Sequence, residues 1–142
     1  IVVDAGGDLG IATTGELMLG WAARRGIAAV VVDGAIRDAA MLGEMEIGVW
    51  ARGITPSGPY KDGPGEIGCP IACGGQVVMP GDLVMADEDG VVVIPQADAA
   101  ATIVAAEAHQ AKEQAAQAAI DAGTWERDWV AAALRAKGCE GA

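Results

Sequence analysis

Apolar residues in the first third of the chain fall into three short runs that predict buried β-strands. The runs cover residues 1–4, 28–33 and 47–52, and the second contains three successive valines. An unbroken, β-branched run of this length is typical of a strand that is buried on both faces of a parallel sheet. The second strand is expected to end at a Gly turn, at Gly34.

Between these runs the apolar spacing changes to that of helices. Residues 15–25 carry a helical stripe and end in Arg24-Arg25-Gly26, as helices commonly do. Thr13 and Glu16 match a capping box at its start. Residues 36–46 predict a second, short helix. Strand, helix and strand in such close succession predict a right-handed parallel crossover.

The second half of the chain has a different pattern. Residues 53–65 contain four Gly and three Pro, so a long irregular loop is expected there. Short apolar runs separated by Gly-containing turns then predict an antiparallel meander with strands at residues 67–73, 76–79, 83–86 and 91–94. The expected fold class is therefore α/β.

The last third of the chain predicts helices. Residues 96–122 are rich in Ala and free of Gly and Pro, which favours one long helix ending at Gly123. Trp125, Trp129 and Leu134 form a narrow apolar stripe on a terminal helix. We expect residues 96–142 to be a helical extension of a single domain that spans residues 1–142.

Length and composition agree with one domain, since 142 residues with 52% apolar content can bury a core. Because the chain opens at Ile1, inside an apolar run and without an initiator Met, we expect an N-terminal segment to precede it. No apolar stretch reaches the roughly 20 residues of a membrane span, so a soluble, cytoplasmic protein without a membrane partner is expected.

The charge balance limits which kinds of partner the chain can bind. Twenty acidic and nine basic residues give a formal net charge of −11, and no Lys/Arg cluster is present that could follow a phosphate backbone. Nucleic acid is therefore a poor candidate. A small anion could still bind wherever a single Arg is exposed.

Cysteine and histidine chemistry has little support. Cys69, Cys73 and Cys139 are odd in number, and His109 is the only histidine. Their spacing does not match a zinc site, and nothing near His109 resembles a nucleophile. We expect Cys69 and Cys73 to act as small buried hydrophobic residues.

The strongest candidates for chemistry are Glu16, Arg37 and Asp38. Each should lie in the first turn of a helix that leaves the carboxyl ends of the parallel strands, where ligands bind in open α/β sheets. The free amides of such a turn, for example those of Leu17 and Met18, favour an anion, and Arg37 can hold a carboxylate bidentately. Carboxylate oxygens suit Mg²⁺ or Mn²⁺.

Each residue also has a purely structural interpretation. Glu16 could be only the second half of the capping box with Thr13. Arg37 and Asp38 could be a surface pair in a first helical turn, where the helix dipole favours Asp.

The order of the motifs resembles that of the RraA-like family, which includes the 4-hydroxy-4-methyl-2-oxoglutarate/4-carboxy-4-hydroxy-2-oxoadipate aldolases. The matching segments cover residues 1 to about 95. They are Gly15-Glu16-Leu17, Val31-Val32-Asp33-Gly34-Ala35-Ile36-Arg37-Asp38, Ala51-Arg52-Gly53-Ile54-Thr55-Pro56, Gly63-Pro64-Gly65-Glu66, Gly74-Gly75, Pro80-Gly81-Asp82 and the run from Ala86 to Pro95. The resemblance implies a layered α-β-β-α sandwich of the swivelling type, and trimers or hexamers with sites between subunits.

The resemblance also implies roles for individual residues in a class II pyruvate aldolase. Asp38 would bind the divalent metal directly, and Glu16 would hold a metal-bound water. Arg37 and the amides of Leu17 and Met18 would bind the pyruvate moiety of a 4-hydroxy-2-oxo acid. Glu113 is our candidate for the carboxylate that a neighbouring subunit supplies in the family. Oxaloacetate decarboxylation would follow as a second activity.

Two positions depart from the aldolase pattern. Glu16 stands where the characterised aldolases have Asp, and Met41 stands where an acidic residue often follows the Arg-Asp pair. The alternative function is a regulator that inhibits a ribonuclease by protein contact, as other members of the family do. The Asp of the Arg-Asp pair argues against that alternative, because the regulators known to us lack it.

Overall fold

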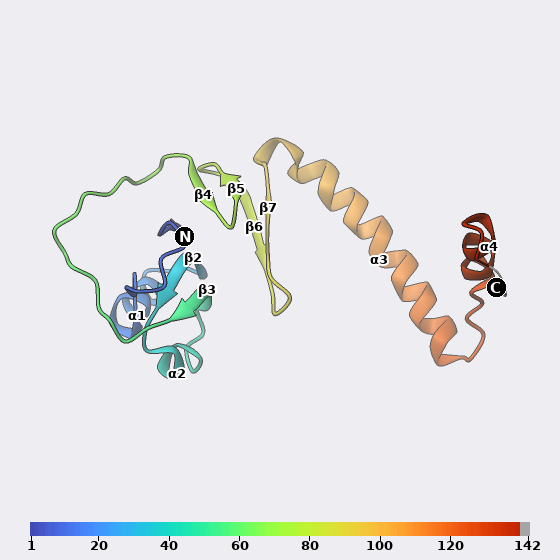
Figure 1. Cartoon of the computed structure of the whole chain (residues 1–142), viewed down its shortest axis with the longest axis horizontal. Coiled ribbons are helices and arrows are strands. Elements are labelled where there is room, and N and C mark those ends of the chain that lie inside the picture. Colours follow the sequence, from blue (N-terminus) through green and yellow to red (C-terminus); the bar gives the residue numbers. More distant parts are fainter. Residues whose placement is uncertain (140–142) are drawn as a thin grey trace. The chain divides into compact units, whose positions relative to one another are not determined.

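Three parallel strands form the centre of the first part of the molecule, in the order β1-β2-β3. They are β1 (Val2–Asp4), β2 (Ala29–Ile36) and β3 (Gly48–Ile54). The structure is a computed structural model that describes residues 1–139, and it divides into two compact units, Ile1–Ala99 and Ala100–Ala142. The predicted parallel pairing is confirmed, since β2 pairs in parallel with both β1 and β3, and a helix follows each of β1 and β2 (Figure 1).

Two helices, α1 (Glu16–Arg24) and α2 (Ala39–Leu42), contribute to the core of this unit. Leu19 of α1 and Leu42 of α2 pack with four buried aliphatic residues of the sheet region, namely Val30, Val32, Ile36 and Ile47. Every residue of β2 from Val30 to Ile36 is buried. The prediction of a strand buried on both faces is thus confirmed.

The helix starts differ from the predicted ones. The N-cap of α1 is Gly15, which has no side chain to cap the helix, so the predicted capping box of Thr13 and Glu16 is wrong. The second helix has four residues rather than eleven, because β2 continues to Ile36 and Asp38 adopts a left-handed conformation before α2 begins.

Gly34 lies inside β2 rather than at a turn. Its lack of a Cβ allows two other segments to approach the strand closely. A Cβ atom at this position would lie 2.7 Å from Ala5 Cβ and 3.0 Å from the backbone oxygen of Asp8. The amide of Ala35 donates to that same oxygen at 2.9 Å. Gly34 therefore permits the close contact between β2 and the loop after β1.

We expect Gly34→Ala to lower the free energy of unfolding by about 1–3 kcal/mol, the usual effect of overpacking a closely packed site. Gly65→Ala is the matched control, because a Cβ atom there has no heavy atom within 4 Å. Urea unfolding of both variants tests this. An effect of Gly34→Ala no larger than that of Gly65→Ala would contradict it.

The second half of this unit consists of two separate antiparallel pairs. The first pair is β4 (Ile71–Cys73) with β5 (Gln76–Val78), and the second is β6 (Leu83–Ala86) with β7 (Val91–Ile94). The antiparallel pairing is confirmed, although the four strands do not form one continuous meander sheet. Residues 55–70 contain no helix or strand, so the irregular loop expected at 53–65 is confirmed except that β3 continues to Ile54.

The first strand of the predicted meander begins later than residue 67. Gly68 has a left-handed φ of 71°, and Pro70 has no N–H to donate to a neighbouring strand. Regular pairing therefore starts only at Ile71.

Asp4, at the end of β1, and Asp33, within β2, hold β4 in place. Asp4 and Asp33 are register partners in β1 and β2. The Ala72 amide donates to Asp4 Oδ2 at 3.3 Å, and the Gly74 amide donates to Asp33 Oδ2 at 2.9 Å.

A 3₁₀ turn (Gln96–Asp98) precedes the second unit, whose helices are α3 (Ala99–Asp121) and α4 (Asp128–Ala136). The predicted long helix is confirmed with slightly shorter bounds. It ends where Gly123 adopts a φ of 68° and Thr124 donates its amide to the Ala119 oxygen at 2.9 Å. Within residues 1–139, none of the helices combines the length and the apolar character that a membrane crossing requires.

Candidate functional site

Arg37 and Asp38 occupy the turn between β2 and α2. β2 ends at Ile36, and the Arg37 amide donates to the backbone oxygen of Thr14 at 3.0 Å. Asp38 is the N-cap of α2 with φ 58° and ψ 33°. The prediction that this pair lies in the first turn of a helix is therefore wrong, because both residues precede the helix.

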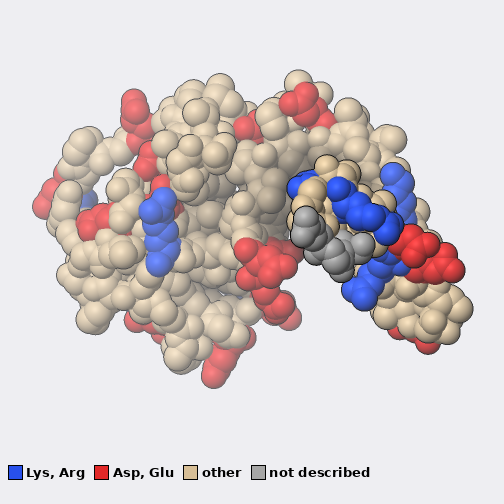
Figure 2. All heavy atoms as spheres, turned by 45° about the vertical axis from the view of Figure 1, so that its right-hand side comes forward, with Lys and Arg blue, Asp and Glu red and all other residues tan. Residues whose placement is uncertain are grey.

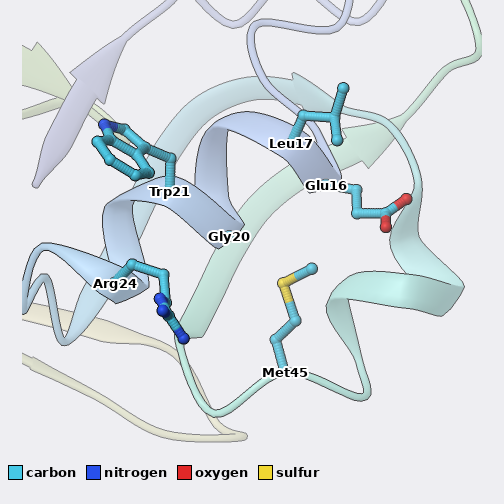
Figure 3. A pocket seen from close by; sticks show the side chains of 6 residues that line it. All are labelled: Glu16, Leu17, Gly20, Trp21, Arg24 and Met45. Carbon is cyan, nitrogen blue, oxygen red and sulfur yellow. The ribbon is translucent and has the colours of Figure 1, made fainter.

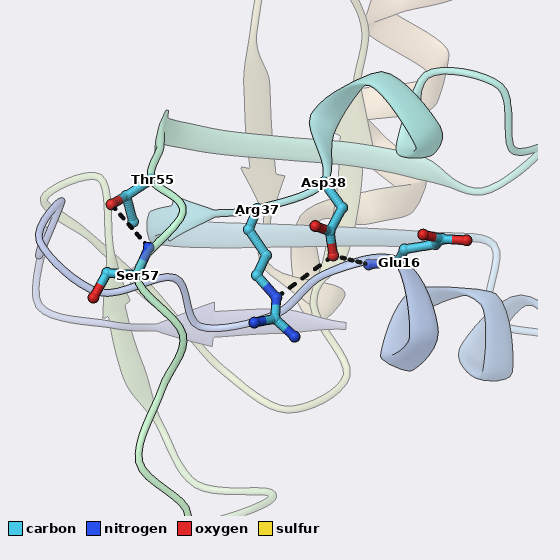
Figure 4. Close-up of polar contacts among 5 residues, drawn as sticks. All are labelled: Glu16, Arg37, Asp38, Thr55 and Ser57. Carbon is cyan, nitrogen blue, oxygen red and sulfur yellow. Dashed lines mark hydrogen bonds and ion pairs between the residues drawn. The ribbon is translucent and has the colours of Figure 1, made fainter.

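Asp38 is the only non-glycine residue with positive φ among residues 1–139. Asp tolerates this conformation better than most residues, yet it still costs roughly 1 kcal/mol relative to ordinary backbone conformations. Such strain persists where the surrounding contacts enforce it, and it is common at functional sites. In this protein it directs the Asp38 carboxylate toward the start of α1 (Figure 4).

The Asp38 carboxylate connects the two helix starts. Its Oδ2 accepts the backbone N–H of Glu16 at 3.1 Å and lies 3.5 Å from Arg37 Nε. Figure 4 shows the carboxylate between the guanidinium on one side and the first residue of α1 on the other. The backbone start of α1, Arg37 and Asp38 therefore lie together, whereas the Glu16 side chain points away from the Asp38 carboxylate (Figure 4).

The Arg37 and Asp38 side chains are 43% and 38% exposed. Their mutual attraction is therefore weakened by solvent and leaves both groups available to a ligand. The backbone amides of Leu17 and Met18 belong to the first turn of α1, where N–H groups have no acceptor within the helix. A cation, a carboxylate and helix-start amides thus meet at one exposed place.

A hollow of about 290 Å³ lies beside Glu16, along the outer face of α1 (Figure 3). Its walls are largely apolar, and Glu16 and Arg24 supply its charged groups. Arg37 and Asp38 do not line this hollow. The lining residues are Glu16, Leu17, Gly20, Trp21, Arg24 and Met45.

The residues present fit a hard divalent cation that keeps most of its waters. The partly exposed Asp38 carboxylate supplies oxygens of the kind that Mg²⁺ prefers, and one or two such protein ligands are usual for it, while the Glu16 carboxylate points away from Asp38 in Figure 4. Within residues 1–139, no group of three or more His, Cys, Asp or Glu side chains gathers in the arrangement of a metal cage. The carboxylates thus suit a water-rich metal site rather than a structural one.

Glu113 belongs to the second unit, whereas Arg37 and Asp38 belong to the first. It lies on α3 in the second unit, is exposed, and its Oε1 is 3.2 Å from Nε2 of His109 one helical turn earlier. Its assignment as the supporting carboxylate stays a prediction.

The structure shows a second cavity, of about 330 Å³, that the sequence did not reveal. It lies between the parallel sheet and the hairpins of the same unit, with apolar walls that include Trp50 and Val93. Its polar residues include Asp33, Arg52 and Cys73, and Arg52 Nε forms an ion pair with the buried Asp33 carboxylate. The only sequence signal for this pair was its place in two strands of the sheet.

Burial raises the pKa of the Cys73 thiol, and the carboxylates of Asp33 and Asp4 raise it further, despite nearby Arg52. The thiol therefore stays protonated at neutral pH and is a poor nucleophile. Cys69 and Cys73 are free, as expected, but both are partly exposed rather than buried.

Acidic side chains occur at many separate points of the surface shown in Figure 2. This distribution agrees with the net charge of −11. A small anionic ligand therefore experiences a repulsive field over much of the surface. The guanidinium of Arg37 beside the α1 amides is a local exception.

Comparison with known proteins gives a consistent family match. The family described as "RraA-like: Aldolase/RraA" matches residues 1–93. A protein of Halalkalibacterium halodurans is 42% identical over 120 residues, which are 84% of this chain and 57% of that protein. A "4-hydroxy-4-methyl-2-oxoglutarate aldolase" of Thermus thermophilus is 41% identical over 96 residues, or 68% of this chain and 58% of that protein.

A solved structure shares the fold. It is described as Streptomyces coelicolor RraAS2, "an unusual member of the RNase ES inhibitor RraA protein family", and matches with a TM-score of 0.76 at 36% identity. The match covers 82% of this chain and 60% of that one. The chain thus spans less than two thirds of the length of these relatives.

Proposed function

This chain belongs to the RraA-like family, and from that premise we propose that it cleaves a 4-hydroxy-2-oxo acid by a metal-dependent retro-aldol reaction. The products are pyruvate and a second keto acid, and the candidate substrates are 4-hydroxy-4-methyl-2-oxoglutarate and 4-carboxy-4-hydroxy-2-oxoadipate. The proposal depends on one observation. The Asp38 carboxylate lies 3.1 Å from the first amide of α1 and 3.5 Å from the Arg37 guanidinium.

Substrate binding follows from the charges of the site. The C1 carboxylate of the oxo acid pairs with Arg37, and the amides of Leu17 and Met18 donate hydrogen bonds to its oxygens. The substrate is thereby oriented before any bond changes.

The metal ion that Asp38 and Glu16 would hold is Mg²⁺ or Mn²⁺, and when bound it supplies Lewis-acid polarisation of the C2 carbonyl. In the reaction the C3–C4 bond breaks as the C4 hydroxyl loses its proton. The bonding electrons form the enolate of pyruvate, whose charge Arg37 stabilises. Protonation at C3 then yields pyruvate.

The C4 hydroxyl proton needs an acceptor. Glu16 is the first residue of α1, next to Asp38, and its side chain would orient a water that receives this proton. Glu113 of a neighbouring subunit is the candidate that supports this water, in a trimer or hexamer. Oxaloacetate decarboxylation passes through the same enolate and is proposed as a second activity.

A regulatory role is the second candidate function, because the description of the Streptomyces coelicolor relative refers to a family of RNase ES inhibitors. The acidic surface of this chain suits a basic segment of a partner protein. Asp38 favours the enzyme instead, because its partly exposed carboxylate lies beside Arg37 at a strained backbone position, and such strain is common at functional sites.

Release of pyruvate separates the two candidates. We expect turnover of 4-hydroxy-4-methyl-2-oxoglutarate and of oxaloacetate in the presence of Mg²⁺, its loss when EDTA removes the metal, and its recovery when excess Mg²⁺ is added. A coupled lactate dehydrogenase assay measures this. Pyruvate release that is absent or unaffected by EDTA would contradict the proposed mechanism, and inhibition of a ribonuclease would then support the regulatory role.

A further inference from the structure

Two glycines contact the Arg37 side chain, one near its stem and one at its tip. A Cβ atom on Gly15 would lie 2.7 Å from Arg37 Cγ and 3.0 Å from Arg37 Nε. A Cβ atom on Gly58 would lie 2.9 Å from Arg37 Nη1. The side chain thus passes through space that exists only because both positions lack a side chain.

The backbone does not explain these glycines. Gly15 has φ −162° and ψ −167°, an extended conformation that any residue can adopt. Gly58 does not have a left-handed φ either. The close approach of Arg37 is therefore the physical reason for a glycine at each position.

Gly58 lies on a part of the 55–70 loop that is attached to the strand end. Ser57 accepts the Ala12 amide through its backbone oxygen at 2.8 Å, and Thr55 donates its amide to the Ile36 oxygen at 2.9 Å. Ala12 is fully buried, so this attachment is firm. A side chain added at Gly58 would displace the guanidinium, which is the flexible partner, rather than the loop.

Gly15 has a wider effect. A Cβ atom there would also lie 2.5 Å from Asp38 Oδ2, the oxygen that accepts the Glu16 amide. A side chain at Gly15 would therefore disturb the carboxylate and the guanidinium together. A side chain at Gly58 would disturb the guanidinium alone.

We propose that Gly15 and Gly58 are positioning residues that hold Arg37 beside Asp38 in the orientation that binds the carboxylate of a 2-oxo acid. The functional half of this inference depends on the proposed aldolase activity. The two glycines differ in their effect: Gly58 governs anion binding, and Gly15 governs both anion and metal binding.

The test compares Gly15→Ala, Gly58→Ala and the control Gly65→Ala, which adds the same methyl group to the same loop as Gly58 with no neighbour within 4 Å. Mn²⁺ affinity is measured by electron paramagnetic resonance, and pyruvate affinity by calorimetry in the presence of Mg²⁺. We expect Gly58→Ala to weaken pyruvate binding about tenfold, the loss of one charged hydrogen bond, while Mn²⁺ affinity changes less than about twofold.

Gly15→Ala should weaken the binding of both ligands by at least about fivefold, and Gly65→Ala should change neither. Wild-type pyruvate affinity in Gly58→Ala would overturn the proposal. So would an equal loss in Gly65→Ala, since that would show a general disturbance of the loop.

A second measurement does not depend on the proposed function. The ¹⁵N-¹H signal of Arg37 Nε, identified by its disappearance in Arg37→Lys, reports directly on the environment of the side chain. We expect this signal to shift in Gly15→Ala and Gly58→Ala but not in Gly65→Ala. If the wild-type protein bound neither Mn²⁺ nor pyruvate, the aldolase proposal would fail. The shifts of the Arg37 Nε signal in the three variants would then support or overturn the positioning role by themselves.

Discussion

Asp38→Asn is expected to lower Mg²⁺-dependent pyruvate release by a factor of about 10³. Asn keeps the shape of Asp and also tolerates the left-handed conformation of this position. It removes the charge on which metal binding depends, and Lewis-acid stabilisation is worth several kcal/mol. Initial rates over a range of Mg²⁺ concentrations test this.

The contribution of Asp38 to stability can be separated from its contribution to catalysis. The Asn side chain still offers an oxygen to the Glu16 amide, so the free energy of unfolding should change by less than about 0.5 kcal/mol. Asp38→Gly removes both the charge and the left-handed strain, and should be equally inactive while remaining folded. Near-wild-type rates of pyruvate release in either variant would show that the metal does not bind at Asp38.

Arg37→Ala is expected to lower kcat/KM for the oxo acid by a factor of about 10²–10³. The variant loses a bidentate charged contact with the substrate carboxylate, and it loses the stabilisation of the enolate as well. Because one contact acts in the ground state and the other in the transition state, KM should rise and kcat should fall. Steady-state kinetics with 4-hydroxy-4-methyl-2-oxoglutarate measures both.

Arg24→Ala is the matched control for this variant. Arg24 is on the same helix as Glu16 and lines the hollow beside it, so it is the competing cation for an anionic substrate. Arg24→Ala should leave kcat/KM within about twofold of the wild type, because the proposed substrate carboxylate does not touch it. A larger loss of kcat/KM in Arg24→Ala than in Arg37→Ala would indicate that the substrate carboxylate binds in the hollow along α1.

Much of the fold could be predicted from the sequence, because the pattern of apolar and polar residues reflects burial along each helix and strand. The valine run of β2 is apolar on both faces, and the strand is indeed buried throughout from Val30 to Ile36. The Ala-rich segment lacks helix breakers, and it forms the long helix α3. The predictions failed where a boundary depends on distant residues, as at Gly34, which serves a contact with Ala5 rather than a turn.

The candidate site shows the same division. Glu16, Arg37 and Asp38 could be selected from residue type and spacing, since charged residues placed after buried strands and at helix starts indicate a ligand site. The structure brings Arg37 and Asp38 to the first backbone amide of α1, while the role of the Glu16 carboxylate stays a prediction. The glycines beside Arg37 could not be selected, because a glycine in an extended conformation or in a loop carries no signal of what approaches it.

By itself, the sequence determined which segments are strands and helices and which residue types stand at their ends, because these follow from local periodicity and composition. Only the tertiary structure decided that the Asp38 carboxylate turns back to the first amide of α1, and that Arg37 lies between two glycines from segments far apart in the chain. The first of these contacts joins residues 22 positions apart, Glu16 and Asp38. Their geometry depends on how the strands and loops pack, which no local pattern records.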